Sequence, residues 1–302
     1  MRDRFSTILL SAFTIAGLLL TAAPQATRAA SLKVAIIVGP TGSQTDDYRD
    51  RANDEARAAR NAGAEVVKVY SPRATWENVV AAVKDANIVI YHGHGNGFPN
   101  PYTSFTLPDG TQCTPNTTRQ RCELKDRTNG FGLNKTEDGG NSDGKGLVYC
   151  GQKALEGRLT AGDGANQRRY CGGTHSGGIN PAPNFVMIFA NACYAPGEGE
   201  PGTNTRLKRA RARVYNYSEP SLKLGAGAYY ATDLGARRLV TLLLTERHRT
   251  YRWIYDQLAV ARGHDCGAEH RPGDRAGRHL RRGRRRHPRS SRSPPARCAS
   301  RR

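Results

Sequence analysis

Short β-branched apolar runs alternate with helical segments in the first part of the chain, and this alternation constrains the fold most strongly. Residues 33–38, 64–70 and 87–91 have the composition of buried parallel strands. The segments between them, at about 46–61 and 75–83, repeat Ala or Val at helical spacing and begin with Asp or Thr as capping residues. Strand, helix, strand, helix, strand is the pattern of a doubly wound, mainly parallel sheet with helices on both faces. The sequence therefore predicts an α/β fold.

Two further strands and a helical segment are predicted after a long irregular region. Residues 98–183 are rich in Gly, Asn, Thr and charged residues and show no strand or helix periodicity. They are too many for a simple connection. They are expected to form an insertion, in which residues 130–134 make an ordered loop. Buried strands are predicted again at 184–192 and 224–232, and the helical segment at 236–258 is expected to pack an apolar stripe on the sheet.

The first thirty residues have the composition of a secretory signal peptide. Arg2 and Arg4 precede an uncharged apolar run at residues 8–20, and small residues follow it. A membrane-spanning helix needs about twenty apolar residues, so this run is too short for one. Cleavage is expected just after Ala29 or Ala30. The mature protein is then expected to be secreted or held at the cell surface, without a membrane segment of its own.

The formal charge of +20 is concentrated in a C-terminal tail. Residues 262–302 hold fourteen Arg, no Lys and three acidic residues. Such a composition cannot bury enough apolar surface to offset the entropy of ordering, so the tail is expected to be disordered. The abrupt change to Arg indicates a shifted reading frame, with a genuine basic tail as the alternative. The α/β domain is therefore assigned to residues 31–261, and nucleic acid is not its expected partner.

The seven cysteines fall into three groups. Cys113, Cys122, Cys150 and Cys171 lie in the insertion, and two lie in the tail. In an oxidising compartment the first group predicts two disulfides, most simply Cys113 with Cys122 and Cys150 with Cys171. A zinc site is the alternative, although none of the spacings is the short C-x2–4-C of zinc ribbons. Cys193 stands apart, directly after an apolar strand.

His94 and Cys193 are the candidate catalytic pair. Each follows a predicted buried strand, and ligands of open parallel sheets gather at the carboxyl ends of the strands. If the two strands are neighbours, the imidazole and the thiol come within reach of each other. A thiol with a pKa near 8.5 is mostly protonated at neutral pH, so a nucleophilic cysteine needs a base such as His94.

These motifs resemble those of the caspase-like clan of cysteine peptidases, which includes caspases, metacaspases, legumain, clostripain and gingipains. The clan carries its base in a His-Gly pair after an apolar strand, matched by His94, and its nucleophile in an Ala-Cys or Ser-Cys pair, matched by Cys193. The chain also resembles an uncharacterised group of exported bacterial proteins with G-H-G-N-G and C-Y-A-x-G motifs, matched at residues 93–97 and 193–197. The resemblance implies a caspase-like fold and an exported hydrolase that cleaves peptides or proteins without a cofactor.

The same analogy implies roles for residues around the pair. Backbone N–H groups of Gly95 and Cys193 would hold the oxyanion of the tetrahedral intermediate. His92 is expected to share a strand face with His94. Four residues near the strand ends are candidate pocket residues: His92, Asn96, Glu198 and Glu200.

Three alternatives stay open. Cys193 is an inert buried thiol in the first, and the protein is then a non-catalytic cell-surface or binding module on the same scaffold. In the second, His92 and His94 are ligands of a metal hydrolase, although Gly95 and Gly97 follow where such sites often supply Asp or a further His. In the third, the Arg-rich tail binds nucleic acid or another anionic polymer.

Overall fold

The computed structural model describes most of the predicted domain. The described residues are 31–96, 105–106, 110, 112–113, 129–161, 163, 165–172, 177–199, 205–232 and 235–261. All of them belong to one unit, Ser31–Arg302. The predicted signal peptide, Cys122, Glu200 and the Arg-rich tail lie outside the described residues.

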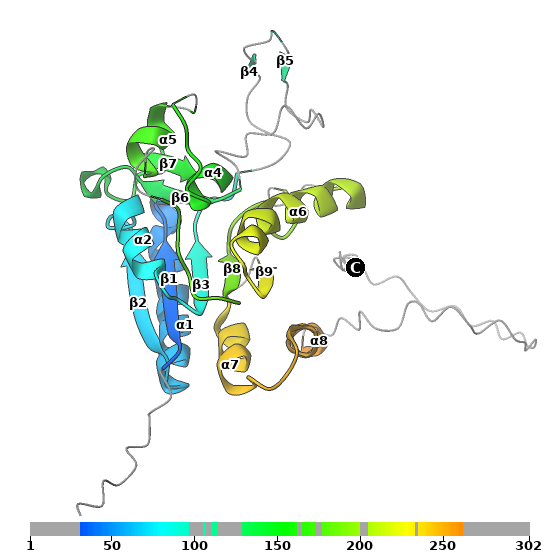
Figure 1. The fold of residues 1–302 in the computed structure, drawn as a ribbon. Helices are drawn as coiled ribbons and strands as arrows, with labels where there is room; N and C mark the ends of the chain where they lie inside the picture. The colour runs from blue at the N-terminus through cyan, green and yellow to red at the C-terminus, as the bar shows by residue number, and fades with distance from the viewer. Residues whose placement is uncertain are drawn as a thin grey trace, which may run out of the picture. The chain divides into compact units, whose positions relative to one another are not determined.

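A five-stranded parallel sheet forms the centre of the domain, in the order β2-β1-β3-β8-β9 (Figure 1). Its strands are β1 (Lys33–Val38), β2 (Glu65–Tyr70), β3 (Ile88–His92), β8 (Val186–Ala190) and β9 (Ala228–Thr232). The three inner strands are almost wholly buried because helices cover both faces, which is why they are continuous apolar runs without polar alternation. The predicted α/β class is therefore confirmed, and each predicted strand is present within a few residues of its expected bounds.

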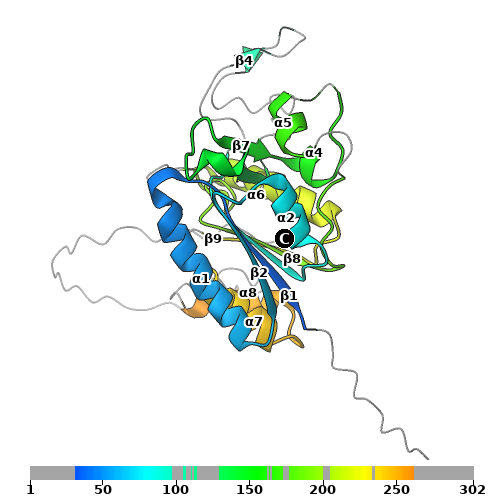
Figure 2. The ribbon, with the colours of Figure 1, turned by 90° about the vertical axis from the view of Figure 1, so that its left-hand side faces the viewer.

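Helices cover the two faces of the sheet (Figure 2). On one face, Ala52, Ala56 and Ala59 of α1 (Thr45–Asn61) pack in a cluster with Leu239 and Val240 of α7 (Arg237–Thr245). On the other face lie α2 (Trp76–Val83) and α6 (Leu207–Lys223), which bury Trp76 and Tyr217 in a second cluster. None of the helices in the described ranges is both long and apolar enough to cross a membrane.

Residues 98–183, which were predicted to form an insertion, contain regular structure that the sequence did not indicate. Its elements are β4 (Phe105–Thr106), β5 (Gln112–Cys113), β6 (Phe131–Asn134), β7 (Leu147–Cys150), α4 (Gln152–Leu155) and α5 (Ala165–Tyr170). The prediction of a loop at residues 130–134 was wrong, because β6 pairs with β7 in an antiparallel hairpin and is fully buried. Phe131 and Leu133 enter the core beside the sheet, but two apolar residues among glycines are too short a pattern to indicate a strand.

The helices after β8 also differ from the prediction. The segment at 236–258 is not one helix but two, α7 and α8 (Tyr251–Ala261), separated by the polar residues 246–250. Helix α6 was not predicted at all. It buries Arg213, Asn216 and Ser221 along with Tyr217, so its inner face lacks the apolar periodicity by which helices are recognised.

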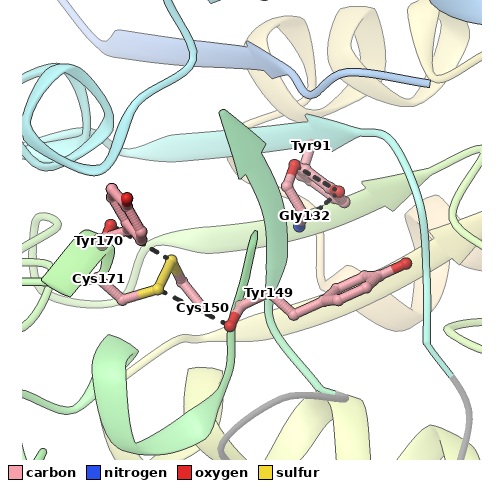
Figure 3. Close-up of a disulfide and its surroundings, with 6 residues drawn as sticks. All are labelled: Tyr91, Gly132, Tyr149, Cys150, Tyr170 and Cys171. Carbon is pink, nitrogen blue, oxygen red and sulfur yellow. Dashed lines mark hydrogen bonds between the residues drawn. A yellow bond between two sulfur atoms is a disulfide. The ribbon is translucent and has the colours of Figure 1, made fainter. Parts of the chain in front are cut away.

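A disulfide between Cys150 and Cys171 ties the end of β7 to the residue that follows α5 (Figure 3). This is one of the two expected pairs. The other expected pair includes Cys122, which lies outside the described residues. Both half-cystines are buried in the core cluster that also contains β6.

Replacing both cysteines of this disulfide by serine is expected to lower the free energy of unfolding by about 3 kcal/mol, because the bond closes a loop with a sequence separation of 21 residues. Urea denaturation of the wild type and of the Cys150→Ser/Cys171→Ser variant measures the difference. The denaturation midpoint of wild-type protein treated with reductant should approach that of the variant. Equal denaturation midpoints for the oxidised wild type and the variant would contradict the expectation.

Candidate functional site

The loops that carry His94 and Cys193 meet at the carboxyl edge of the sheet. Strands β3 and β8 are parallel neighbours, with His92 paired to Ala190, so both chains leave the sheet side by side. Gly95 then lies directly on the backbone of Cys193: a Cβ at this position would fall 1.7 Å from the Cys193 carbonyl oxygen and 2.8 Å from its amide nitrogen. Only glycine permits so close an approach.

The imidazole of His94 is paired with a carboxylate from the insertion. Its Nε2 lies 3.4 Å from Oδ2 of Asp143, and the two side chains are 34% and 49% exposed. This separation is longer than a well-formed hydrogen bond, but catalytic hydrogen bonds are often long before substrate binds. Since Asp143 contacts Nε2, the other ring nitrogen, Nδ1, remains for a second interaction.

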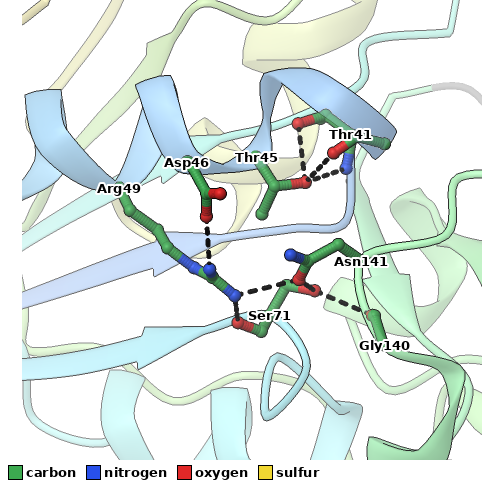
Figure 4. A network of polar contacts seen from close by, with 8 residues as sticks. Thr41, Thr45, Asp46, Arg49, Ser71, Gly140 and Asn141 are labelled. Atoms are coloured by element: carbon green, nitrogen blue, oxygen red, sulfur yellow. Dashed lines mark hydrogen bonds and ion pairs between the residues drawn. The ribbon is translucent and has the colours of Figure 1, made fainter.

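A polar network anchors the loop that supplies Asp143 (Figure 4). Arg49 of α1 donates to Oδ1 of Asn141 at 2.9 Å and also to the carbonyl of Ser71. The amide of Gly42 donates to the carbonyl of Asn141 at 2.9 Å. These bonds join the loop to the segments that follow β1 and β2 and to α1, and they hold Asn141, which lies two residues before Asp143.

Cys193 is a thiol, not half of a disulfide, and it is partly buried against the core. The turn that follows it is held from two directions. The hydroxyl of Tyr229 donates to the carbonyl of Ala195 at 3.0 Å, and the guanidinium of Arg213 lies 4.7 Å from the ring centre of Tyr194. Strand β9 and helix α6 therefore support the loop that presents the thiol.

His92 lies inside the protein on the face of the sheet covered by α1. Its Nε2 is 2.7 Å from Oε2 of Glu55, both side chains are fully buried, and its Nδ1 is 3.2 Å from Oδ1 of Asn191. The expectation that His92 and His94 share a face was wrong, because β3 ends at His92 and the strand alternation does not continue to His94. The two histidines contact different carboxylates, Glu55 and Asp143.

The other candidate pocket residues have different surroundings. Asn96 is half-buried, and its carbonyl accepts a hydrogen bond from Tyr217 at 2.8 Å. Its side-chain Oδ1 is buried without a partner among the described residues. Glu198 is exposed, while Glu200 lies outside the described residues. Within the ranges that the structure describes, no three His, Cys, Asp or Glu side chains are grouped to hold a metal ion.

Comparison with family models, curated proteins and solved structures finds no significant match to this chain. The function is therefore inferred from the geometry and chemistry of the site.

Tyr91 lies on the face of the sheet opposite to His92, and from there it supports the loop that carries His94. Its hydroxyl accepts a hydrogen bond from the amide of Gly132 at 2.8 Å. The hydroxyl lies 2.9 Å from the carbonyl of His94 and 3.2 Å from that of Gly132, and we assign its single proton to the nearer acceptor, His94. Burial raises the pKa of Tyr91 well above its ordinary value of 10.0. The hydroxyl consequently keeps its proton, and remains a donor, throughout the neutral and mildly alkaline range.

Three side chains that shape the site were not predicted: Tyr91, Glu55 and Asp143. Tyr91 was counted only as an apolar strand residue. Glu55 lies between Ala52 and Ala59 on the buried face of α1, and a single acid in an apolar stripe is a signal that could have identified it. Asp143 lies in a segment of Gly, Asn and Ser without periodicity, so the sequence carries no comparable signal for it.

Proposed function

We propose that this protein is an exported cysteine-dependent hydrolase that cleaves peptide bonds, with Cys193 as nucleophile and His94 as base on a caspase-like scaffold. The observation that carries the proposal is the contact of Gly95 with the backbone of Cys193, which joins the two loops at the carboxyl edge of β3 and β8. Active sites of open parallel sheets lie at this edge.

The proposed reaction uses the two nitrogens of the His94 ring differently. Asp143 orients the ring through Nε2, and Nδ1 accepts the proton of the Cys193 thiol. The thiolate attacks the carbonyl carbon of the substrate, and the carbonyl electrons move to its oxygen. When the C–N bond breaks, His94 returns the proton to the leaving amine. Water, deprotonated by His94, then hydrolyses the thioester and releases the acid.

The oxyanion formed in each step needs donors that are already in position. The amides of Gly95 and Cys193 are the proposed donors, and the backbone packing of the two residues supports this assignment, since a Cβ built on Gly95 would lie 2.8 Å from the Cys193 nitrogen. Fixed backbone donors of this kind commonly contribute about 10²- to 10³-fold to the rate of acyl transfer.

The pairing of thiol and imidazole is tested by alkylation of Cys193. Wild-type Cys193 is expected to react with iodoacetamide at pH 7 about tenfold faster than Cys193 in a His94→Ala variant, because an imidazole that takes the thiol proton raises the thiolate fraction. Mass spectrometry of the Cys193 peptide over time gives the rate. His248→Ala, which removes a mostly exposed histidine on a turn, is the matched control and should label like the wild type.

The alternative function, a non-catalytic binding module, predicts a different outcome of the same measurement. An inert thiol would react slowly and equally in the wild type and both variants. A library of fluorogenic peptides, assayed in parallel, would then show no cleavage above the His94→Ala background. Both results together would overturn the hydrolase proposal.

A further inference from the structure

The Tyr91 hydroxyl stands in the middle of a hydrogen-bonded chain that begins in the insertion and ends at the His94 loop. The amide of Gly132 in β6 donates to the hydroxyl at 2.8 Å, and the hydroxyl donates to the His94 carbonyl at 2.9 Å (Figure 3 shows Tyr91 and Gly132). The backbone at Gly93 lies close to this oxygen, since a Cβ at Gly93 would be 2.3 Å from it. The side chain of Tyr91 is fully buried.

The carbonyl that Tyr91 binds belongs to the same peptide unit as the amide of Gly95. A trans peptide is planar, and its C=O and N–H point in opposite directions. A hydroxyl that draws the His94 carbonyl toward the core therefore turns the Gly95 N–H away from the core. Gly95 is also the residue whose α-carbon is packed against the backbone of Cys193, since a Cβ built there would meet the Cys193 carbonyl and amide nitrogen.

We propose that Tyr91 is a positioning residue that directs the N–H of Gly95 toward the substrate oxyanion, an inference that rests on the cysteine-hydrolase function proposed above. Tyr91 does not touch the substrate. It acts through the peptide plane, and the chain from Gly132 through the hydroxyl to the His94 carbonyl also polarises that plane. Hydrogen bonds in such chains strengthen one another, so Gly95 becomes the better donor.

Two other tyrosines, Tyr217, which is buried, and Tyr229, which is partly buried, show what is particular to Tyr91. Tyr217 donates to the carbonyl of Asn96 at 2.8 Å, and Tyr229 donates to the carbonyl of Ala195 at 3.0 Å. All three rings pack around Phe189, with centroid separations of 5.2 to 5.8 Å. The carbonyl that Tyr229 binds is in the peptide unit between Ala195 and Pro196, which has no N–H because its nitrogen belongs to a proline. Of the three, only Tyr91 holds the peptide unit that contains the Gly95 amide.

Tyr91→Phe removes the hydroxyl and keeps the ring. We expect kcat to fall by about 10- to 100-fold with KM changed less than threefold, because an oxyanion donor acts in the transition state and not on bound substrate. The affinity for a peptide aldehyde, which forms a tetrahedral adduct with the thiol, should fall with kcat. Tyr230→Phe is the matched control. The hydroxyl of Tyr230, in β9, donates to the carbonyl of Tyr251 at 2.9 Å, away from the site, so its removal should leave kcat unchanged.

Three results would overturn the proposal for Tyr91. They are a kcat in Tyr91→Phe within threefold of wild type, a loss confined to KM, or an equal loss of kcat in Tyr230→Phe, which would indicate a general effect of removing a tyrosine hydroxyl and not an effect on the Gly95 amide.

A crystal structure of the wild type with the peptide aldehyde tests the same point without a variant. A hemithioacetal oxygen within about 3.2 Å of the Gly95 nitrogen supports the proposal. An adduct on Cys193 whose oxygen lies elsewhere overturns it while leaving the hydrolase function standing. If no adduct forms on Cys193, the hydrolase function itself fails.

Discussion

Cys193→Ala is expected to abolish peptide hydrolysis, lowering kcat/KM by about 10⁴-fold or more, because no other group in the proposed mechanism can form the thioester. The fold should survive, since the change removes one sulfur atom from a partly buried position on a turn. Cleavage of the best peptide from the library, measured with matched circular dichroism melts, tests both parts.

Cys193→Ser is the companion variant because it keeps a side chain of similar shape with a hydroxyl in place of the thiol. A hydroxyl loses its proton far less readily than a thiol, so this variant should be nearly as inactive as the alanine variant. Turnover near the wild-type level in either variant, with preparations freed of other hydrolases, would show that Cys193 is not the nucleophile.

Glu55→Ala is expected to lower the free energy of unfolding by about 3 to 5 kcal/mol, which is enough to unfold many domains. Its carboxylate is fully buried and accepts two hydrogen bonds, from His92 at 2.7 Å and from the amide of Ala236 at 2.5 Å. Removing it leaves both donors buried without a partner, and each such group costs about 1 to 3 kcal/mol. Guanidinium denaturation followed by circular dichroism measures the change.

Asp54→Ala gives the matched comparison on the same helix. Asp54 is paired with Arg57 at the surface, where both side chains are about half exposed or more. Exposed ion pairs contribute little, so this variant should lose at most about 1 kcal/mol. A Glu55→Ala variant as stable as Asp54→Ala would mean that the buried contacts of Glu55 do not hold α1 and α7 to the sheet.

The sequence predicted the central sheet well because its strands are buried on both faces. Residues 33–38 and 87–91 are short apolar runs rich in β-branched residues, a pattern that favours buried parallel strands. Strand β6 and helix α6 escaped prediction for the opposite reason. Their buried faces contain glycine, asparagine, serine and arginine, whose burial depends on partners far away in the chain.

The same distinction applies to the candidate site. His94 and Cys193 could be selected from sequence because each directly follows a strand, and parallel pairing of those strands brings their ends together. Asp143 could not, because it lies in a loop that is held by contacts from distant parts of the chain, such as those of Arg49 and Gly42 with Asn141, two residues before it. Tertiary contacts of an irregular loop produce no periodic pattern in the sequence from which they could be predicted.

The parallel pairing of β3 with β8 also determines when the site can form. His92 and Asn191, which bond across the ends of these strands, are 99 positions apart in the chain. Closing so long a loop is slow compared with forming local helices and hairpins, and it requires that the intervening insertion be out of the way. A chain that has not yet made this pairing keeps its thiol and imidazole in separate segments. In the mechanism proposed above, the nucleophile and its base are therefore brought together only when β3 pairs with β8, and the unfolded chain does not contain the assembled pair.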